Sequence, residues 1–389
     1  MPNSPIDECI QSRVGVAFPG AMVAVRLGNR LVTLRAFGNS HIHPEPVPVR
    51  ADAIFELASM TKPLSTGLLI LAAFDRGLLT PETTVGSVVT DAHPSTRDLT
   101  VHQLLTHTGG LPAVPMLQRF FPDPRWIDPA EAERRLLGLP RETTPATDVV
   151  YSCTGFQLLG VMLQRVTGWT LTRLFAEWIA APLGLPTAGL QPQVRFGEAG
   201  DWRARSVATE YCPWRDEWVR GYVHDESAYC LDGNAGNAGL FATIAEVLTL
   251  TEVWANAGAA RPYGAGSGAS AAGEAFEAHR GTAPVQLVRP ETIGAATRCY
   301  TEGMAQRRGR AVQFNTAEAA GGPALSSDSF GHTGFTGCHF WIDPTRELTV
   351  VAMCSRLQYG REATLEPIKQ FRQELHRAVV TELGCRLRR

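Results

Sequence analysis

Lysine is almost absent from this sequence. The 389 residues include only two lysines, Lys62 and Lys369, against 34 arginines. Arginine therefore supplies nearly all of the positive surface charge, and a lysine at position 62 calls for a chemical reason. A guanidinium keeps its proton in a protein, whereas a desolvated lysine amine can lose its proton near neutral pH and serve as a base.

Long apolar runs and basic clusters are also missing. No segment has the roughly eighteen consecutive apolar residues that a membrane span needs, and residues 1–8 lack a positive region followed by an apolar run. The formal net charge is −2, and no basic cluster is interleaved with aromatic residues. We therefore expect a cytoplasmic protein that binds neither nucleic acid nor membranes.

The cysteines form no Cys-x-x-Cys pair and no regular spacing, so neither a structural zinc nor a disulfide framework is expected. Reduced, mostly buried thiols are the simplest interpretation. The run His224-Asp225-Glu226 is not a metal site either, because adjacent side chains do not share one face of a helix or strand. No metal and no other cofactor is predicted. The eight cysteines are Cys9, Cys153, Cys212, Cys230, Cys299, Cys338, Cys354 and Cys385.

The stretch around Ser59 and Lys62 carries the first chemical signal. Apolar residues recur after it at helical spacing, which predicts a buried helix from the serine to about Arg76 with Ser59 on its first turn. Spacing of i and i+3 on a helix would place the serine hydroxyl beside the lysine amine. Pro63 is tolerated in a first turn. A capping serine followed by a solvated lysine is the structural alternative.

The two ends of the chain have β character, and the middle is mostly helical. Residues 21–27 and 30–38 predict a hairpin around Gly28-Asn29, and helices are expected at residues 6–17 and around 368–379. Strands are expected again at residues 331–335, 338–343 and 348–354, and helices within the middle at residues 95–108, 155–166 and 171–179.

The predicted fold class is α+β: an antiparallel sheet flanked by N- and C-terminal helices, with an inserted all-helical subdomain. The sheet subdomain comprises residues 1–76 and 285–389, and residues 77–284 form the insertion. A Gly- and Ala-rich loop at residues 255–281 falls within the insertion. The active site is expected in the crevice between the two parts.

Three motifs in order resemble those of the serine β-lactamase and penicillin-binding-protein superfamily. They are Ser-Met-Thr-Lys at residues 59–62, Tyr-Ser-Cys at residues 151–153 and His-Thr-Gly at residues 332–334. Residues 104–112, 223–226 and 236–241 also look like the class C and family VIII esterase-like branch, so the resemblance covers nearly all of residues 15–385.

The resemblance implies a role for each matching residue. Ser59 would be the acylated nucleophile, and Lys62 with Tyr151 would share the proton transfer. The oxyanion would be bound by the backbone N–H groups of Ser59 and Phe335, with Gly334 allowing close approach of the strand to the acyl group. His332, Thr333 and Cys153 would complete the substrate-binding surface.

Two positions depart from the family pattern. His332 stands where β-lactamases usually have lysine, and a histidine is only partly charged at neutral pH, which weakens carboxylate recognition. Cys153 stands where the family usually has asparagine, and a thiol cannot replace the amide's donor and acceptor. Both changes argue against β-lactamase or D-Ala peptidase activity.

The sequence therefore predicts a serine hydrolase that works through an acyl-enzyme, with small acyl esters as substrates. An acyltransferase that passes the acyl group to an amine or alcohol, and a non-catalytic ligand-binding member, remain as alternatives. The oligomeric state stays open. Six aromatic residues either line an apolar substrate wall or only pack the insertion: Trp202, Tyr211, Trp214, Trp218, Tyr222 and Tyr229.

Overall fold

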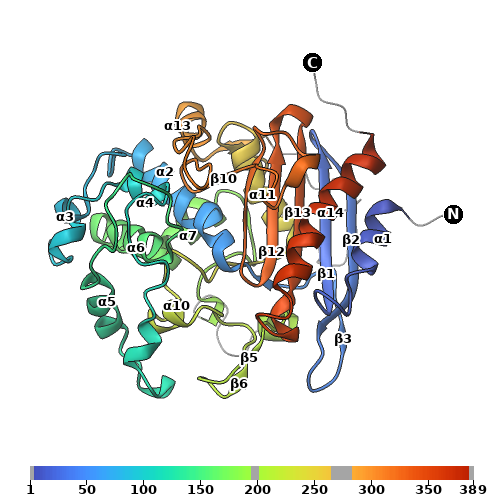
Figure 1. The fold of residues 1–389 in the computed structure, drawn as a ribbon, viewed down its shortest axis with the longest axis horizontal. Coiled ribbons are helices and arrows are strands. Elements are labelled where there is room, and N and C mark those ends of the chain that lie inside the picture. Colours follow the sequence, from blue (N-terminus) through green and yellow to red (C-terminus); the bar gives the residue numbers. More distant parts are fainter. Residues whose placement is uncertain (1–3, 194–200, 264–282, 385–389) are drawn as a thin grey trace.

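The computed structural model describes residues 4–193, 201–263 and 283–384. Its centre is a seven-stranded sheet in which every neighbouring pair runs antiparallel. Figure 1 shows the two chain ends combined in this sheet, blue beside red, with the helical middle of the chain on one side. The sheet order is β10 (Gln313–Phe314), β11 (Phe330–Thr333), β12 (Gly337–Asp343), β13 (Leu348–Ser355), β1 (Gly20–Leu27), β2 (Arg30–His41) and β3 (Val47–Pro48).

Both faces of the sheet are covered. Along β1, Ala21, Val23 and Val25 point to one face, where α1 (Pro5–Gln11) and α14 (Leu365–Leu383) pack (Figure 1). The alternate residues of the strand join the larger core on the other face. Because both faces are buried, the central strands are continuously apolar instead of alternating. The predicted α+β sheet with terminal helices is thus confirmed.

The predicted insertion is not all-helical, because it contains short β-strands as well as helices. Residues 77–284 include the strand pair β5 (Tyr211–Cys212) with β6 (Glu217–Trp218), and two more strands that pair with strands outside this range: β7 (Phe241–Ala242) with β4 (Phe55–Glu56), and β8 (Ala259–Ala260) with β9 (Val285–Gln286). The α-helices of this range are α3 (Val85–Val88), α4 (Val101–Leu105), α5 (Pro129–Leu137), α6 (Cys153–Thr167), α7 (Leu171–Phe175), α9 (Trp202–Arg205), α10 (Glu226–Cys230) and α11 (Ile244–Ala255), and it is flanked by α2 (Leu68–Asp75) and α13 (Pro290–Ala296).

One helix of the predicted insertion lies against the sheet. α11 contacts β1 and β13, and its buried Glu252 pairs with Arg26 of β1. The division of the chain at residues 76 and 285 stays a prediction. Most of the Gly- and Ala-rich stretch, from residue 264 onward, lies outside the described residues.

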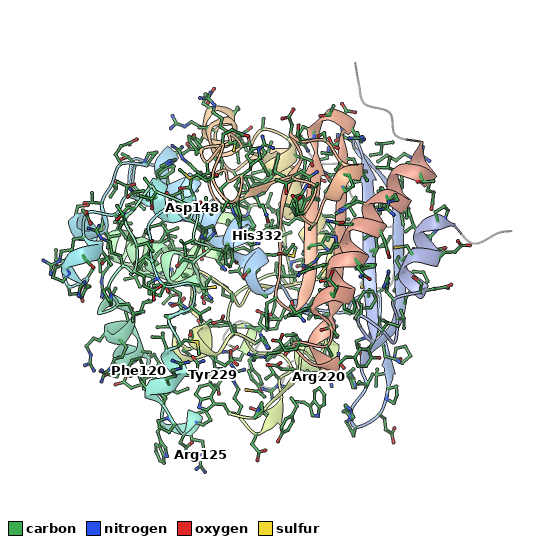
Figure 2. All side chains as sticks on the ribbon, viewed as in Figure 1. Phe120, Arg125, Asp148, Arg220, Tyr229 and His332 are labelled. Carbon is green, nitrogen blue, oxygen red and sulfur yellow. The ribbon has the colours of Figure 1, made fainter. Side chains whose placement is uncertain are left out.

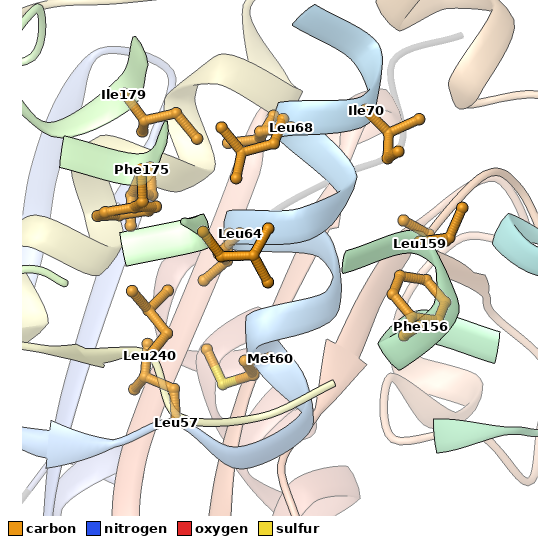
Figure 3. Packing of buried hydrophobic residues seen from close by; sticks show 14 of the residues in the cluster. Leu57, Met60, Leu64, Leu68, Ile70, Phe156, Leu159, Phe175, Ile179 and Leu240 are labelled. Atoms are coloured by element: carbon orange, nitrogen blue, oxygen red, sulfur yellow. The ribbon is translucent and has the colours of Figure 1, made fainter. Parts of the chain in front are cut away.

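The segment that carries Ser59 is not one continuous α-helix. It begins as the 3₁₀-helix η1 (Ala58–Met60), widens into the π-helix η2 (Lys62–Gly67) and becomes α-helical only in α2. A π turn inside a helix is uncommon and is found mostly at functional sites. Figure 3 shows this segment packed between Phe156 and Leu159 of α6 on one side and Phe175 and Leu240 on the other. The buried packing therefore fixes Ser59 and Lys62 from both sides.

Three other predicted helices are shorter than expected. The helix at residues 6–17 ends at Gln11, and residues 95–108 form a 3₁₀ turn, Pro94–Thr96, followed by the short α4. Thr100 forms a capping box with Gln103, which starts α4 later than the apolar spacing suggested. The third segment, residues 171–179, is α-helical only to Phe175 and continues as a π-helix.

Candidate active site

Ser59 and Lys62 lie in hydrogen-bond contact. The Lys62 Nζ is 2.9 Å from the Ser59 Oγ, although the two residues belong to different helix types. Lys62 is completely buried, whereas Ser59 is partly exposed to a cavity. The solvated-lysine alternative is therefore wrong, because the amine is buried beside Cys153, Asn237 and the Phe156 ring.

The Lys62 ammonium donates to two further acceptors. Its Nζ is 3.1 Å from the backbone oxygen of Asn237 and 3.5 Å from the Cys153 Sγ. An ammonium has three N–H groups, and here each has an acceptor. Burial alone would lower the pKa of Lys62, but Cys153, Tyr151 and Asp225 outweigh it, so the pKa is raised. The expectation of a lysine amine pressed toward neutrality is wrong, and Lys62 is a cation here.

Tyr151 is the remaining candidate for the base. Its ring centroid is 4.9 Å from the Lys62 Nζ, and the residue lines the cavity beside Ser59. The start of α6 fixes its position, because the Ser152 Oγ accepts from the Gly155 N–H at 3.1 Å and donates to the Pro112 oxygen at 2.7 Å. The sequence-predicted trio of Ser59, Lys62 and Tyr151 is thus brought together.

Cys153 sits at the first position of α6 and faces both Lys62 and the cavity. Burial raises the pKa of its thiol above the ordinary value, against the opposing effect of Lys62. The side chain is therefore an uncharged acceptor for the lysine.

His332 and Thr333 are on β11 but face different ways. Thr333 lines the cavity, whereas His332 is buried in the interior between the sheet and the helices (Figure 2). The His332 Nδ1 is 2.8 Å from the Thr333 oxygen and donates to it, which leaves Nε2 as an acceptor without a partner among the described residues. Burial, with Arg308 and Lys62 nearby, lowers the pKa of His332 well below its ordinary value. The ring is neutral and does not line the cavity.

Gly334 and Phe335 form the turn between β11 and β12. The Phe335 N–H has no acceptor among the residues that the structure describes, as expected for an oxyanion donor. The flanking carbonyls are both held by guanidinium groups. The Arg372 Nη2 donates to the Gly334 oxygen at 3.0 Å, and the Arg356 Nε donates to the Phe335 oxygen at 2.9 Å.

Gly334 is required by close packing. A Cβ atom at this position would lie 2.5 Å from the Leu57 oxygen, a backbone atom next to η1. No side chain fits there, so glycine alone lets the β11–β12 turn approach the segment that carries Ser59. Ala58, between them, has a φ of 46°, a strained conformation for a residue with a side chain.

The cavity in front of Ser59 has a volume of about 430 Å³, which is in the range of small-molecule sites. Charged groups line it on two sides: Asp225 and Glu226 at the start of α10, and four basic residues on α14 and the segment before it. Its lining includes Ala58, Ser59, Val114, Met116, Gln118, Tyr151, Cys153, His224, Asp225, Glu226, Ala238, Thr333, Gly334, Phe335, Arg356, Arg361, Leu365, Ile368, Lys369 and Arg372.

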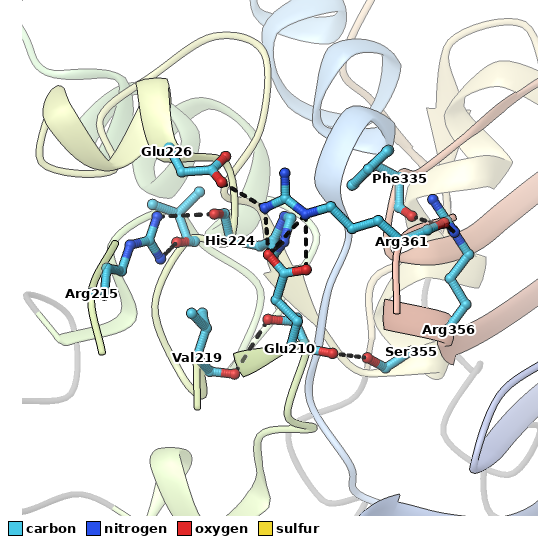
Figure 4. A network of polar contacts seen from close by, with 11 residues as sticks. Glu210, Arg215, Val219, His224, Glu226, Phe335, Ser355, Arg356 and Arg361 are labelled. Atoms are coloured by element: carbon cyan, nitrogen blue, oxygen red, sulfur yellow. Dashed lines mark hydrogen bonds and ion pairs between the residues drawn. The ribbon is translucent and has the colours of Figure 1, made fainter. Parts of the chain in front are cut away.

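A network of paired charges forms the rim of this cavity (Figure 4). The Arg361 Nε is 2.9 Å from the Glu210 Oε2, and its Nη2 is 2.5 Å from the Glu226 Oε1. The His224 Nε2 is 2.7 Å from the Glu210 Oε1, and the His224 ring stacks on Phe335 with centroids 5.8 Å apart. Burial alone would raise the pKa of Glu210, but Arg361 and His224 lower it to about 2. The run at residues 224–226 therefore supplies structural contacts at the rim.

Four of the six aromatic residues pack within the helical region, whereas Tyr211 is exposed and Trp218 stacks on His43. Trp202 is buried with Ile54 and Phe241, and Tyr229 contacts both Trp214 and Tyr222. None of the six lines the cavity in front of Ser59. The substrate-wall interpretation is therefore not supported.

Three residues near the trio carried no local sequence signal. Asn237 lies in a run that resembles the esterase-like branch, but its acceptor role follows only from the fold. Arg308 is buried against Tyr151, and Glu56 is buried on β4, three residues before Ser59. Burial, the largest influence, raises the pKa of Glu56 to about 7.

The described part of the chain has neither a candidate metal cluster nor a candidate membrane-spanning helix. There, no group of three or more His, Cys, Asp or Glu side chains is arranged to hold a metal ion. Within residues 4–193, 201–263 and 283–384, no helix combines the length and apolar character that crossing a membrane requires.

An antiparallel sheet beside a helical region, with a serine and a buried lysine at their junction, is the arrangement of serine β-lactamases and penicillin-binding proteins. The chain belongs to this group: the model of the beta-lactamase family matches residues 6–373.

Curated relatives are distant but cover most of the chain. A protein of Escherichia coli strain K12, provisionally named D-alanyl-D-alanine carboxypeptidase, is 26% identical over 379 residues, covering 90% of this chain and 81% of its own length. An N-acetylmuramyl-L-alanine amidase of Bacillus subtilis strain 168 is 25% identical over 378 residues, covering 90% of this chain and 80% of its own.

Solved structures share the fold. Unliganded simvastatin synthase from Aspergillus terreus has a TM-score of 0.69 at 17% identity, covering 98% of this chain and 99% of its own. EstCE1, described as a hydrolase with promiscuous acyltransferase activity, has a TM-score of 0.66 at 19% identity, covering 96% and 97%. A penicillin-binding-protein homologue from Caulobacter crescentus has a TM-score of 0.68 at 20% identity, covering 97% and 96%.

Proposed function

We propose that this protein is a serine hydrolase that forms an acyl-enzyme on Ser59, with small acyl esters as its substrates. The observation that carries the proposal is the contact of 2.9 Å between the Ser59 Oγ and the Nζ of a fully buried lysine, at the base of a cavity. A buried ammonium beside a serine hydroxyl stabilises negative charge on the oxygen as it attacks.

The chemistry follows from the charges at the site. Tyr151 takes the proton from the Ser59 hydroxyl as the Ser59 Oγ bonds to the acyl carbon of the ester. The negative charge that moves to the carbonyl oxygen is bound by the backbone N–H groups of Ser59 and Phe335. The bond to the leaving alcohol then breaks, and that alcohol takes the proton from Tyr151. In the second half of the reaction, the oxygen of a water molecule bonds to the acyl carbon while Tyr151 takes a proton from that water. The bond between the acyl carbon and the Ser59 Oγ then breaks, the Ser59 Oγ takes the proton from Tyr151, and the acid is released.

Esters are favoured over D-Ala peptides because the cations of the cavity wall already contact carboxylates or neutral oxygens, although the Arg372 Nε has no partner among the described residues. Arg361 pairs with Glu210 and Glu226, and Lys369 is 3.4 Å from Glu366. Arg356 and Arg372 donate to backbone oxygens, and the neutral His332 lies off the cavity. A substrate carboxylate would have to displace these contacts. The curated relatives named for peptidase and amidase activity make D-Ala substrates the necessary comparison.

The first experiment is covalent labelling with a fluorophosphonate, read by mass spectrometry. We expect one adduct on Ser59 in the wild type and none in Ser59→Ala. A folded wild-type protein whose Ser59 stays unlabelled would refute the acyl-enzyme and leave the non-catalytic, ligand-binding alternative.

A substrate panel then separates the activities. Wild type and Ser59→Ala are assayed with p-nitrophenyl esters of increasing chain length, a chromogenic cephalosporin and D-Ala amides. We expect ester hydrolysis that depends on Ser59 and little or no turnover of the other two. Efficient turnover of D-Ala amides would overturn the substrate assignment while leaving Ser59 as the nucleophile.

Acyl transfer is the second candidate. EstCE1 and simvastatin synthase share the fold, and the cavity of about 430 Å³ has room for an acyl group and a small acceptor. Adding amines or alcohols during ester turnover distinguishes the two reactions. Diversion of the acyl group into an amide or new ester would favour transfer, and an unchanged yield of free acid would favour hydrolysis.

A further inference from the structure

Arg372 of α14 is a cation that no carboxylate of the described residues pairs with. Part of its side chain lines the cavity, while its Nε is buried and has no partner in the described part of the chain. Burial lowers its pKa to about 10, so the guanidinium is still charged at neutral pH. Burying a charge without an opposite partner is costly, and the contacts that the guanidinium does make therefore require an explanation.

The hydrogen bonds of Arg372 within the described residues all go to the turn between β11 and β12. Its Nη2 donates to the oxygens of Gly334 at 3.0 Å, Gly337 at 3.2 Å and Cys338 at 3.4 Å. The turn is closed by the Gly337 N–H, which donates to the same Gly334 oxygen at 3.1 Å. One nitrogen of a C-terminal helix therefore holds three carbonyl groups of the turn together.

Phe335 occupies the first central position of this turn. Its N–H is not used by the bond that closes the turn, and it has no acceptor among the described residues. The Phe335 N–H and the Gly334 oxygen are the two ends of one planar peptide group. A cation bonded to that oxygen withdraws electron density from the nitrogen, which makes the N–H a stronger donor. The same bond fixes the direction in which the N–H points.

We propose that Arg372 is a positioning residue for the oxyanion: its guanidinium fixes the Gly334–Phe335 peptide group and strengthens the Phe335 N–H as a donor to the charged oxygen. This inference rests on the proposed function. The effect is confined to steps in which the acyl oxygen carries negative charge, because the carbonyl group of a bound ester is neutral. Arg372 thus acts on the reaction through a backbone group.

Three substitutions separate the charge from the packing of this side chain. Arg372→Lys keeps the charge, Arg372→Gln keeps a donor without the charge, and Arg372→Met removes both. We expect kcat for p-nitrophenyl ester hydrolysis to fall in that order, by about ten- to a hundredfold in Arg372→Met, with KM within about twofold of wild type. Acylation and deacylation both pass through a charged oxygen, so the loss appears in kcat whichever step limits the rate.

Arg13→Met is the matched control. The Arg13 Nε is 3.1 Å from the Glu374 Oε2 of α14, so this arginine also holds the helix, but neither residue lines the cavity. The control should keep the wild-type kcat. The proposal is overturned if Arg372→Lys and Arg372→Gln lose kcat equally, or if Arg13→Met loses as much kcat as Arg372→Met. The comparison of the lysine and glutamine variants decides the matter even where Arg372→Met does not fold.

A second measurement does not depend on activity. Glycine is followed by phenylalanine only at residues 155–156 and 334–335, so labelling glycine carbonyls with ¹³C and phenylalanine nitrogens with ¹⁵N gives two paired NMR signals. In Arg372→Gln, the signals of the Gly334 carbonyl and the Phe335 nitrogen should move upfield because the bond to the cation is lost, and the pair at 155–156 should stay. Unmoved signals from residues 334–335 would contradict the proposal. Failure of fluorophosphonate labelling would instead refute the proposed function, and these signals would still report whether Arg372 acts on the Phe335 peptide group.

Discussion

The two charged regions next to the cavity are built in opposite ways. At the rim, the Arg361 guanidinium is matched by the carboxylates of Glu210 and Glu226 (Figure 4). Behind Ser59, the cations Lys62 and Arg308 contact hydroxyl, thiol, amide and aromatic groups, and no carboxylate of the described residues pairs with either. One region has its charges balanced, and the other has positive charge in excess.

The comparison distinguishes charged groups that hold the fold together from charged groups that can stabilise negative charge during a reaction. Paired charges at the rim fix His224 and Phe335 at the edge of the cavity and have little left to offer a substrate. Unbalanced cations in the interior stabilise any negative charge that develops nearby, on Ser59, Tyr151 or the oxyanion. Three variants test this contrast, from the largest expected effect to the smallest.

Lys62→Arg should have the largest effect. The charge is kept, but a planar guanidinium cannot aim compact donors at the Ser59 Oγ, the Asn237 oxygen and the Cys153 Sγ. We expect the rate of fluorophosphonate labelling and of ester hydrolysis to fall about a thousandfold or more. Lys369→Arg, at the other lysine of the chain, is the matched control and should retain activity. An active Lys62→Arg variant would mean that the position requires only a positive charge.

Glu56→Gln should have the next largest effect, on stability. Glu56 is the opposite case to Lys62 and Arg308, because it is a buried acidic group. Its Oε1 accepts from the Gly239 N–H at 3.1 Å, and its Oε2 has no partner among the described residues. Burial raises its pKa to about 7 in the folded protein, from an ordinary value of 4.5. The folded chain thus holds a proton that the unfolded chain releases as pH rises between these values, so stability falls over this range.

The free energy of unfolding of the wild type should therefore decrease by up to about 3 kcal/mol between pH 4.5 and pH 7 through this group. Glu56→Gln removes this loss, so the variant should gain stability relative to wild type as pH rises and match it in acid. Urea unfolding at both ends of the range measures the difference. A difference that is the same at both ends would show that Glu56 does not titrate in this way.

Arg361→Met should have the smallest effect, about 1–2 kcal/mol of unfolding free energy, because this side chain is 40% exposed and solvent screens it. Its Glu210 partner has a folded pKa near 2, so the contribution is present above the unfolded value and lost as pH falls toward 2. The stability difference from wild type should shrink in acid, and kcat should change little. A large loss of kcat at full stability would place Arg361 in the catalytic machinery.

Local signals account for the parts of the fold that were predicted. The hairpin around Gly28-Asn29 and the strands after Phe330 have turn residues and apolar runs of the right length. Apolar spacing also located the buried segment after Ser59, but not its 3₁₀ and π turns. These depend on packing against α6 and Leu240, and spacing along one segment carries no information about such partners.

Some residues of the candidate site were predicted from the sequence, and others are brought to the site only by the fold. Ser59, Lys62 and Tyr151 were identified because motif order and the scarcity of lysine mark them. Asn237 is 175 residues beyond Lys62 in the sequence, and Arg308 lies in the segment before β10. Neither residue has a local sequence pattern that indicates a contact with the site. The direction of the Lys62 pKa was mispredicted because it depends on Cys153, Tyr151 and Asp225 acting together against burial.

Gly334 sets the distance between the β11–β12 turn and the segment that carries Ser59. A single methyl group at this position would meet the Leu57 oxygen at 2.5 Å, and neither side of that contact is a flexible side chain. The distance between the turn after β11 and the segment carrying Ser59 is therefore possible only because residue 334 has no Cβ atom. Any residue larger than glycine would wedge the sheet away from the helical region and widen the space between the Ser59 and Phe335 N–H groups. The width of the proposed oxyanion site is thus set at a residue that contributes no side chain.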